Sequence, residues 1–333
     1  MADTISILER LKPINLDAGS VFSGKPSGTS VVGFAKPSVF TPAKDQSYIF
    51  HDESRDVAVW FLDQNDPLYV FGPQGSGKTS LVKQIAAMLN YPVFEVTGHN
   101  RLEFPELVGH LIVKDGQMSF EYGPLSLAMK YGGLFLLNEI DILDPSTAAG
   151  LNGVLDGSPL CVPENNGELI VQHPMFKFVA TGNTNGTSDE TGLYQGTLRQ
   201  NSAFMDRFWL VEIGYPKPES EEKLLAKTAP TLPPELRSKM VSYANEVRKL
   251  FMANLSKGSE TALEVTFSTR TLIRWANLTV KFQPLAWQGL SPINHSLDRA
   301  MAFRAIPESR VFLHELLQRF FASDIAPKSN TQK

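Results

Sequence analysis

Short apolar runs separated by polar loops dominate the first two thirds of the chain. Five of them have the length and composition of strands buried in a parallel sheet. They cover residues 67–71, 92–96, 132–138, 176–181 and 208–213. Helix-forming stretches at 52–62, 80–89 and 145–156 stand before or between these runs. This order predicts an α/β core built on a parallel five-stranded sheet.

Two further segments alternate between apolar and polar residues around a turn signal. Asp115-Gly116 stands inside residues 111–120, and Asn166-Gly167 stands inside residues 160–171. Such dipeptides between alternating runs predict β-hairpins. The first hairpin interrupts what should be a helical crossover, so both are predicted to be insertions into the α/β core.

Beyond Pro216 the apolar positions follow a helical period. Leu236, Met240, Ala244, Val247 and Phe251 fall on one face of a helix. Further helices are expected at 268–282, 295–305 and 308–322, which together predict a helical lid domain.

The N-terminal residues carry weaker signals. Residues 4–11 predict a short helix that Pro13 ends, and the Gly-, Ser- and Pro-rich residues 19–37 predict a linker or a wrapped arm. We therefore expect an N-terminal arm or linker at 1–44, an α/β core at 45–216 and the helical lid at 217–333.

A glycine-rich loop follows the first predicted strand of the core and leads directly into a helix. This order of strand, loop and helix is typical of a phosphate-binding loop. Its backbone N–H groups would surround a triphosphate, a lysine would add charge at the β- and γ-phosphates, and a threonine hydroxyl would bind Mg²⁺. The predicted nucleotide-binding residues are Gly72, Pro73, Gln74, Gly75, Ser76, Gly77, Lys78, Thr79 and Ser80.

Polar residues end two of the predicted strands, at the sheet edge where ligands bind. Glu139 could orient the water that attacks the γ-phosphate, or it could be an ordinary charge at a strand end. Asn183 could contact the γ-phosphate or that water, or it could be a turn residue. Together with the phosphate loop, Glu139 indicates catalysis of ATP hydrolysis.

Composition narrows the class of protein. With 31 Lys and Arg against 35 Asp and Glu, the net charge of -4 predicts no general attraction to nucleic acid or anionic lipid. Cys161 is the only cysteine, which excludes disulfides within the chain and thiolate zinc sites. No stretch is long and apolar enough to predict a membrane span or a signal peptide. We expect a cytoplasmic protein.

The succession of these motifs resembles the AAA+ ATPases, and the two hairpins resemble the helix-2 insert and the pre-sensor hairpin of the MoxR branch. Several segments are also similar to the CobS type, the AAA+ subunit of cobaltochelatase. The segments that carry the resemblance are His173-Pro174, Ala180-Thr-Gly-Asn183, Thr191-Gly-Leu-Tyr-Gln-Gly-Thr197, Met205-Asp-Arg207-Phe208 and Ser268-Thr-Arg270.

The resemblance implies roles for three of these residues. Asn183 would be sensor 1, Arg207 the arginine finger and Arg270 sensor 2. Arg199 is a competing candidate for the finger. Arg207 and Arg270 could instead pair with surface carboxylates.

One position departs from the family pattern. The family usually has Asp where this chain has Asn138. An amide keeps an acceptor oxygen but loses the charge that helps to hold the Mg²⁺ shell, so reduced Mg²⁺ affinity is expected. Asp141 stands too far along the chain to replace that charge simply.

The resemblance further implies a function. It indicates a ring, expected to be a hexamer, that hydrolyses ATP at subunit interfaces and remodels a protein partner with a von Willebrand factor A domain. ATP and Mg²⁺ are the expected cofactors. The alternatives are the ATPase subunit of a cobalt or other metal chelatase, and a nucleotide-gated assembly module with little hydrolysis.

Overall fold

The computed structural model describes residues 2–50, 52–63, 66–114, 116–187, 196–257 and 263–325. Within them the chain divides into two units. The first unit consists of Met1–Gln46, Asp52–Pro73 and Gly77–Gly214. The second consists of Ser47–His51, Gln74–Ser76 and Tyr215–Lys333.

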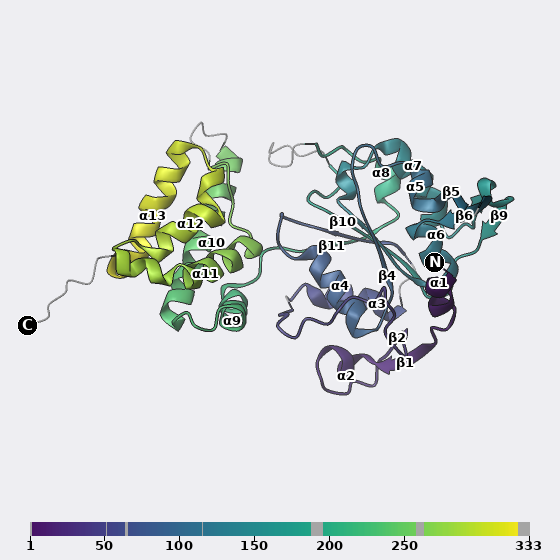
Figure 1. Cartoon of the computed structure of the whole chain (residues 1–333), viewed down its shortest axis with the longest axis horizontal. Coiled ribbons are helices and arrows are strands. Elements are labelled where there is room, and N and C mark those ends of the chain that lie inside the picture. Colours follow the sequence, from purple (N-terminus) through teal and green to yellow (C-terminus); the bar gives the residue numbers. More distant parts are fainter. Residues whose placement is uncertain are drawn as a thin grey trace, which may run out of the picture. The chain divides into compact units, whose positions relative to one another are not determined.

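Five parallel strands form the central sheet of the first unit, in the order β11-β3-β10-β7-β4 (Figure 1). The strands are β3 (Leu68–Phe71), β4 (Val93–Thr97), β7 (Gly133–Asn138), β10 (Phe176–Gly182) and β11 (Trp209–Glu212). Every residue of β7 is buried, as expected for a strand covered on both faces. The predicted five-stranded sheet is confirmed, with each strand end within one residue of its predicted place.

Helices cover both faces of this sheet (Figure 1). One face carries α3 (Ser54–Asp63) and α4 (Lys78–Met88), and the other carries α5 (Phe104–Val108), α6 (Pro124–Tyr131) and α7 (Pro145–Leu155). Because all five strands are parallel, their carboxyl ends lie together at one end of the sheet and their amino ends at the other, here called the carboxyl edge and the amino edge. The candidate site lies at the carboxyl edge.

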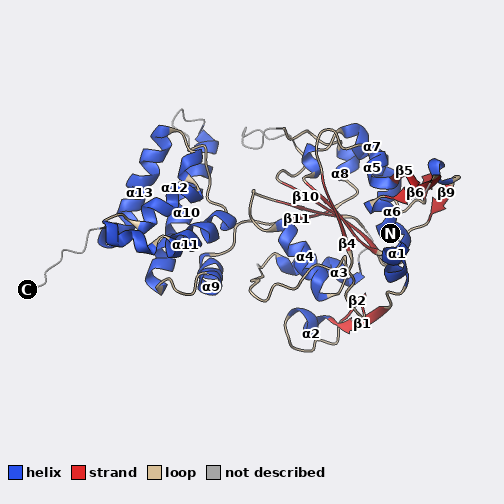
Figure 2. Ribbon diagram, viewed as in Figure 1, coloured by secondary structure: helices blue, strands red, loops and turns tan. Residues whose placement is uncertain are grey.

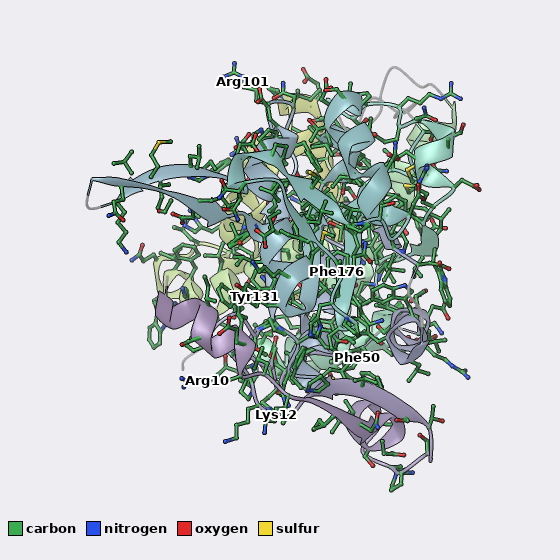
Figure 3. All side chains as sticks on the ribbon, turned by 90° about the vertical axis from the view of Figure 1, so that its right-hand side faces the viewer. Arg10, Lys12, Phe50, Arg101, Tyr131 and Phe176 are labelled. Carbon is green, nitrogen blue, oxygen red and sulfur yellow. The ribbon has the colours of Figure 1, made fainter. Side chains whose placement is uncertain are left out.

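Both predicted hairpins are present. The first pairs β5 (Gly109–Lys114) with β6 (Gln117–Tyr122), and the second pairs β8 (Leu160–Val162) with β9 (Glu168–Ile170). The first stands between α5 and α6, inside the crossover from β4 to β7, and Figure 3 shows it projecting from the body of the unit. Asp115 at its predicted turn lies outside the described residues.

The N-terminal segment consists of α1 (Ala2–Glu9), β1 (Pro13–Asp17), α2 (Ala18–Phe22) and β2 (Ser30–Phe34). The strands β1 and β2 pair antiparallel. Only β2 lies within residues 19–37, for which we left a linker or a wrapped arm open. Asp17 closes the connection by accepting hydrogen bonds from the backbone N–H groups of Ser20, Ser27 and Gly28, at 2.7, 3.1 and 2.7 Å. These bonds, above all the one from Ser20, lower the pKa of Asp17 to about 2.

A short helix, α8 (Ser202–Met205), precedes β11. The backbone N–H of Leu198 donates to Asp141 O at 2.7 Å, and the N–H of Gln200 donates to Gly186 O at 3.0 Å. These long-range bonds hold the backbone before α8 against Asp141 and Gly186. Asn201 then caps the short helix through its side chain.

The described residues of the second unit form helices and no strand (Figure 2). The helices are α9 (Pro218–Thr228), α10 (Pro234–Lys257), α11 (Thr269–Lys281), α12 (Pro292–Ala300) and α13 (Pro307–Ile325). Their shared core is built around Tyr243, Phe267 and Trp275, which are fully buried. The all-helical prediction is confirmed.

The helix expected at 295–305 is displaced. Helix α12 begins earlier, where Ser291 caps it and Pro292 occupies its first turn, and it ends at Ala300. A short 3₁₀ turn, Ala302–Arg304, follows. The expected helix therefore has the right type and the wrong bounds, because its cap and its proline were not used to place its start.

Candidate nucleotide site

All three glycines of the loop between β3 and α4 have a positive φ. Gly72 has φ 143° and Gly77, the residue before α4, has φ 97°. A Cβ atom on Gly72 would stand 2.1 Å from the carbonyl oxygen of Ile213. Only glycine fits this conformation and this approach, so the loop can follow the sheet edge closely.

Lys78, the first residue of α4, is buried with its ammonium group turned back over the loop. Its Nζ donates to the carbonyl oxygens of Gly72 and Pro73, at 2.8 and 3.0 Å. It also donates to Asn183 Oδ1 at 3.1 Å. The structure therefore brings the predicted phosphate-binding lysine together with the predicted sensor.

Thr79 and Asn138 meet at the same edge. Thr79 Oγ1 donates to Asn138 Oδ1 at 2.7 Å, and Thr181 Oγ1 donates to the same oxygen at 3.0 Å. On its other side, Asn138 Nδ2 donates to Glu95 Oε1 at 2.8 Å. Both residues predicted for Mg²⁺ thus share one hydrogen-bond network.

These oxygens fit a magnesium ion of the kind that nucleotide sites hold. Mg²⁺ takes oxygen ligands and keeps several waters, and it is usually bound by one or two protein groups together with phosphates. The hydroxyl of Thr79 and the amide oxygen of Asn138 supply that kind of donor. In the described parts of the chain, no three His, Cys, Asp or Glu residues cluster as a metal cage.

Glu139 follows Asn138 in an unusual backbone conformation. It is exposed, with φ 56° and ψ 44° in the left-handed region. Gly98 packs against this turn and donates its N–H to Asn138 O at 2.7 Å. A Cβ atom on Gly98 would stand 2.7 Å from Glu139 O. Left-handed non-glycine residues are uncommon and cluster at functional sites.

Asp141 is a site residue whose role the sequence did not indicate. Its carboxylate is fully buried, and Oδ2 accepts from the backbone N–H groups of Asn183 and Thr184, at 2.7 and 3.1 Å. Burial raises the pKa of Asp141, while these two bonds and the charge of Lys78 oppose the rise. Its sequence signal was an acidic residue within an otherwise apolar turn.

Glu95 was also missed. It lies in β4, and its Oε2 pairs with Lys83 Nζ of α4 at 2.7 Å. Its signal in the sequence was a single charge within the apolar run 92–96.

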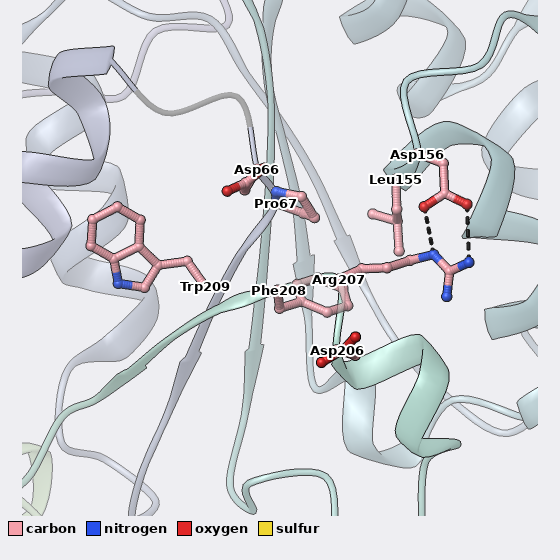
Figure 4. A pocket seen from close by; sticks show the side chains of 8 residues that line it. All are labelled: Asp66, Pro67, Leu155, Asp156, Asp206, Arg207, Phe208 and Trp209. Atoms are coloured by element: carbon pink, nitrogen blue, oxygen red, sulfur yellow. Dashed lines mark hydrogen bonds and ion pairs between the residues drawn. The ribbon is translucent and has the colours of Figure 1, made fainter.

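Arg207 lies at the other edge of the sheet, just before β11. Its Nε and Nη2 donate to Asp156 Oδ1 and Oδ2, at 2.7 and 3.0 Å (Figure 4). The hydrogen bond from Arg207 lowers the pKa of Asp156. The pair lines a cavity of about 500 Å³ that also includes Asp66 and Asp206. Arg207 thus pairs with a carboxylate, which was the alternative to its predicted role as the arginine finger.

Arg199 and Arg270 are both exposed. Arg199 lines a separate cavity of about 610 Å³ together with Asn185 and Asn201. Arg270 is the second residue of α11, in the second unit. Of the segment at 191–197 that carries part of the family resemblance, residues 191–195 lie outside the described residues.

A buried ion pair fixes the start of α11. Arg248 Nη1 and Nη2 donate to the two carboxylate oxygens of Glu221, both at 2.8 Å. Thr269 Oγ1 donates to Glu221 Oε1 at 2.8 Å, and Arg248 Nε donates to Phe267 O at 2.6 Å. The residues on both sides of Ser268 are therefore held, which places Arg270 on a rigid helix end.

Two family models match the chain. The model described as AAA domain (dynein-related subfamily) covers residues 67–208, and the model described as CbbQ/NirQ/NorQ C-terminal covers residues 221–320. The first contains β3, β4, β7 and β10 of the sheet and the site residues of the first unit, and it ends just before β11. The second covers most of the helical residues of the second unit.

Individual proteins show the same likeness. The aerobic cobaltochelatase subunit CobS of Sinorhizobium sp is 28% identical over 285 residues, which is 84% of this chain and 85% of that protein. The uncharacterized protein YojN of Bacillus subtilis is 27% identical, over 70% of this chain and 75% of its own length. A solved structure of a mutant form of RuvB from Thermotoga maritima aligns with a TM-score of 0.44 at 11% identity, over 79% of this chain and 65% of that one.

None of the helices in the described part of the chain has both the length and the apolar character needed to cross a bilayer.

Proposed function

Because the chain joins an AAA domain to the C-terminal domain of the MoxR family, it is a MoxR-type AAA+ ATPase, and we propose that it hydrolyses ATP with Mg²⁺ to remodel a protein partner. One observation carries this proposal. Lys78, Thr79, Asn138 and Asn183 converge by direct hydrogen bonds at the carboxyl edge of the sheet. That edge is where open α/β sheets bind ligands.

Each residue has a role in the proposed reaction. The loop backbone and Lys78 hold the triphosphate. To do so, the Lys78 ammonium group leaves the carbonyl oxygens of Gly72 and Pro73 and contacts the phosphates instead. Glu139 orients and polarises the attacking water, and Asn183 holds the γ-phosphate or that water. When bound through Thr79 and Asn138, Mg²⁺ supplies positive charge to the phosphates. Arg270 is proposed as sensor 2, the role that the family resemblance implies.

We place the active sites at the interfaces of a ring, proposed to be a hexamer in the cytoplasm. Arg207 supports this arrangement. Arg207 precedes β11 and lines a cavity together with Asp66, which precedes β3. The phosphate loop begins at Gly72, six residues after Asp66 and at the opposite end of β3. At about 3.3 Å per residue the two edges stand roughly 20 Å apart, so Arg207 cannot serve the phosphate held by its own loop. A finger at this position acts on a neighbouring subunit.

The partner is proposed to carry a von Willebrand factor A domain, as the family resemblance implies. A metal chelatase is the second candidate. The alignment with CobS supports it, because that alignment covers 84% of this chain and 85% of CobS. Co-purification from the native cells distinguishes the candidates, since a chelatase subunit would be recovered with the other chelatase subunits.

Two substitutions test the proposed reaction. Lys78→Ala should abolish ATP binding, because the phosphates lose their buried counter-charge. Glu139→Gln should retain ATP binding and lower the turnover rate at least a hundredfold, as expected when general acid–base catalysis worth about 10²–10⁴ is lost. Binding of a fluorescent ATP analogue and phosphate release measure the two effects separately. Turnover by Glu139→Gln at the wild-type rate would remove Glu139 from the catalytic role.

A further inference from the structure

The amide of Asn138 is held from both sides in one orientation. It is 7% exposed, and its oxygen accepts from the hydroxyls of Thr79 and Thr181. Its nitrogen donates to Glu95 Oε1 at 2.8 Å. Glu95 Oε2 is in turn bound by Lys83 at 2.7 Å, which leaves Oε1 facing the amide.

The carboxylate of Glu95 fixes the orientation of the Asn138 side-chain amide. An amide has one accepting and one donating end, and a carboxylate only accepts hydrogen bonds. Only the nitrogen of Asn138 can therefore face Glu95. The amide oxygen is consequently turned toward Thr79, the hydroxyl that the proposed function assigns to Mg²⁺. If the amide turned over, two N–H donors would face the cation and the hydroxyl.

We propose that Glu95, braced by Lys83, is a positioning residue that makes Asn138 usable in the magnesium shell. This inference rests on the proposed function. An aspartate at position 138 would not need such orientation, because both of its oxygens accept. It would instead place a second carboxylate against Glu95. Glu95 thus helps an asparagine at this position and opposes an aspartate.

The test is whether Glu95→Gln shifts the Mg²⁺ requirement in opposite directions in the unaltered chain and in the Asn138→Asp variant. The measured quantity is the free Mg²⁺ concentration that gives half-maximal binding of a fluorescent, non-hydrolysable ATP analogue. In the otherwise unchanged chain, Glu95→Gln should raise this concentration about tenfold, because removing a partner that orients a metal group typically costs 10–100-fold in metal affinity. Asn138→Asp alone should change it by less than threefold. In the Asn138→Asp background, Glu95→Gln should lower it about tenfold.

Two further variants complete the experiment. Lys83→Met should shift the Mg²⁺ requirement in the same direction as Glu95→Gln, because Glu95 loses its brace. Glu246→Gln is the matched control, since Glu246 makes a solvent-accessible pair with Lys249 at 3.9 Å in α10. It should leave the Mg²⁺ requirement unchanged.

The outcomes separate the two proposals. If the unaltered chain binds the analogue with Mg²⁺ and Glu95→Gln has no effect, the role of Glu95 is overturned and the proposed function stands. The same holds if Glu95→Gln acts with one sign in both backgrounds, since that indicates a general structural effect. If the unaltered chain binds no analogue, the proposed function itself is overturned, and this inference with it.

Discussion

Asp141 connects three parts of the site at the scale of single residues. Its side chain holds the backbone of Asn183 and Thr184, and its carbonyl oxygen accepts from the N–H of Leu198. Asn183 in turn contacts Lys78. Asp141 therefore links Asn183, the proposed sensor, to the segment that leads to Arg199.

We expect Asp141→Ala to lower the free energy of unfolding by about 1–3 kcal/mol, because backbone N–H groups in the interior lose their acceptor. Asp141→Asn keeps one accepting oxygen and should lose about half as much. Urea denaturation measures both changes. The analogue affinity of the folded Asp141→Ala protein should also fall, because the contact between Asn183 and Lys78 loses its support. Unchanged stability and affinity would exclude this supporting role.

At the scale of elements, one polar cluster joins the base of the first hairpin to the turn end of the second. Lys130 Nζ of α6 donates to Tyr122 Oη of β6 at 2.7 Å and to Glu168 Oε1 of β9 at 2.6 Å. Tyr122 also donates to Glu168 Oε2 at 2.6 Å. Partial burial by itself lowers the pKa of Lys130, but the hydrogen bonds to Glu168 and Tyr122 raise it by more. The pKa of Lys130 is therefore raised overall. The hairpins are thereby braced against the same helix.

The far end of the first hairpin carries exposed apolar side chains. Val113 and Met118 are paired across the strands and are 74% and 69% exposed. An insertion in a crossover is not needed to complete the sheet, so we expect this end to face the pore of the ring and to contact the partner.

Changing Lys114→Ala together with Met118→Ser should abolish remodelling of the co-purified partner and leave basal ATP hydrolysis intact. Stability should change by no more than about 0.5 kcal/mol, because both side chains lie on the surface. ATPase stimulation by the partner and thermal unfolding measure these effects. Val311→Ser, an exposed apolar change in α13, is the control. Loss of folding in the double variant would show instead that the hairpin belongs to the core.

At the scale of the whole molecule, the two edges of the sheet carry complementary parts of a site. Lys78 and Glu139 belong to the carboxyl edge, and Arg207 belongs to the amino edge beside Asp156. A chain with its site at one edge and its proposed finger at the other completes a site only with a neighbour. In such a ring the pair between Arg207 and Asp156 must open for Arg207 to reach the phosphate.

Mixing two inactive variants tests this arrangement. Arg207→Ala should lower turnover by about 10³–10⁵, the usual contribution of an arginine finger. Mixed with Glu139→Gln, it should regain part of the activity, because some interfaces then combine an intact Arg207 with an intact Glu139. ATP turnover as a function of mixing ratio is the measurement.

The control mixture combines Lys78→Ala with Glu139→Gln and should stay inactive, since every site then carries a lesion of its own. If mixed rings of Arg207→Ala and Glu139→Gln form without regaining activity, Arg207 is not the finger and Arg199 takes its place as candidate.

Features that depend on neighbouring residues could be predicted from the sequence. The phosphate loop follows from the spacing of Gly72, Gly77 and Lys78, and the strands follow from short apolar runs between turn residues. Both hairpins follow from a two-residue turn signal. Each of these signals lies within about a dozen residues, where chain geometry alone limits the possible structures.

Only the tertiary structure decided which distant side chains meet. Asn138 and Glu95 are 43 positions apart, Asp141 and Asn183 are 42 apart, and Arg207 and Asp156 are 51 apart. These contacts depend on the order of the strands in the sheet, which places β4 beside β7 and β7 beside β10. Local periodicity carries no information on that order. The sequence by itself therefore predicted a nucleotide site, and the packing of the sheet determined which side chains meet there.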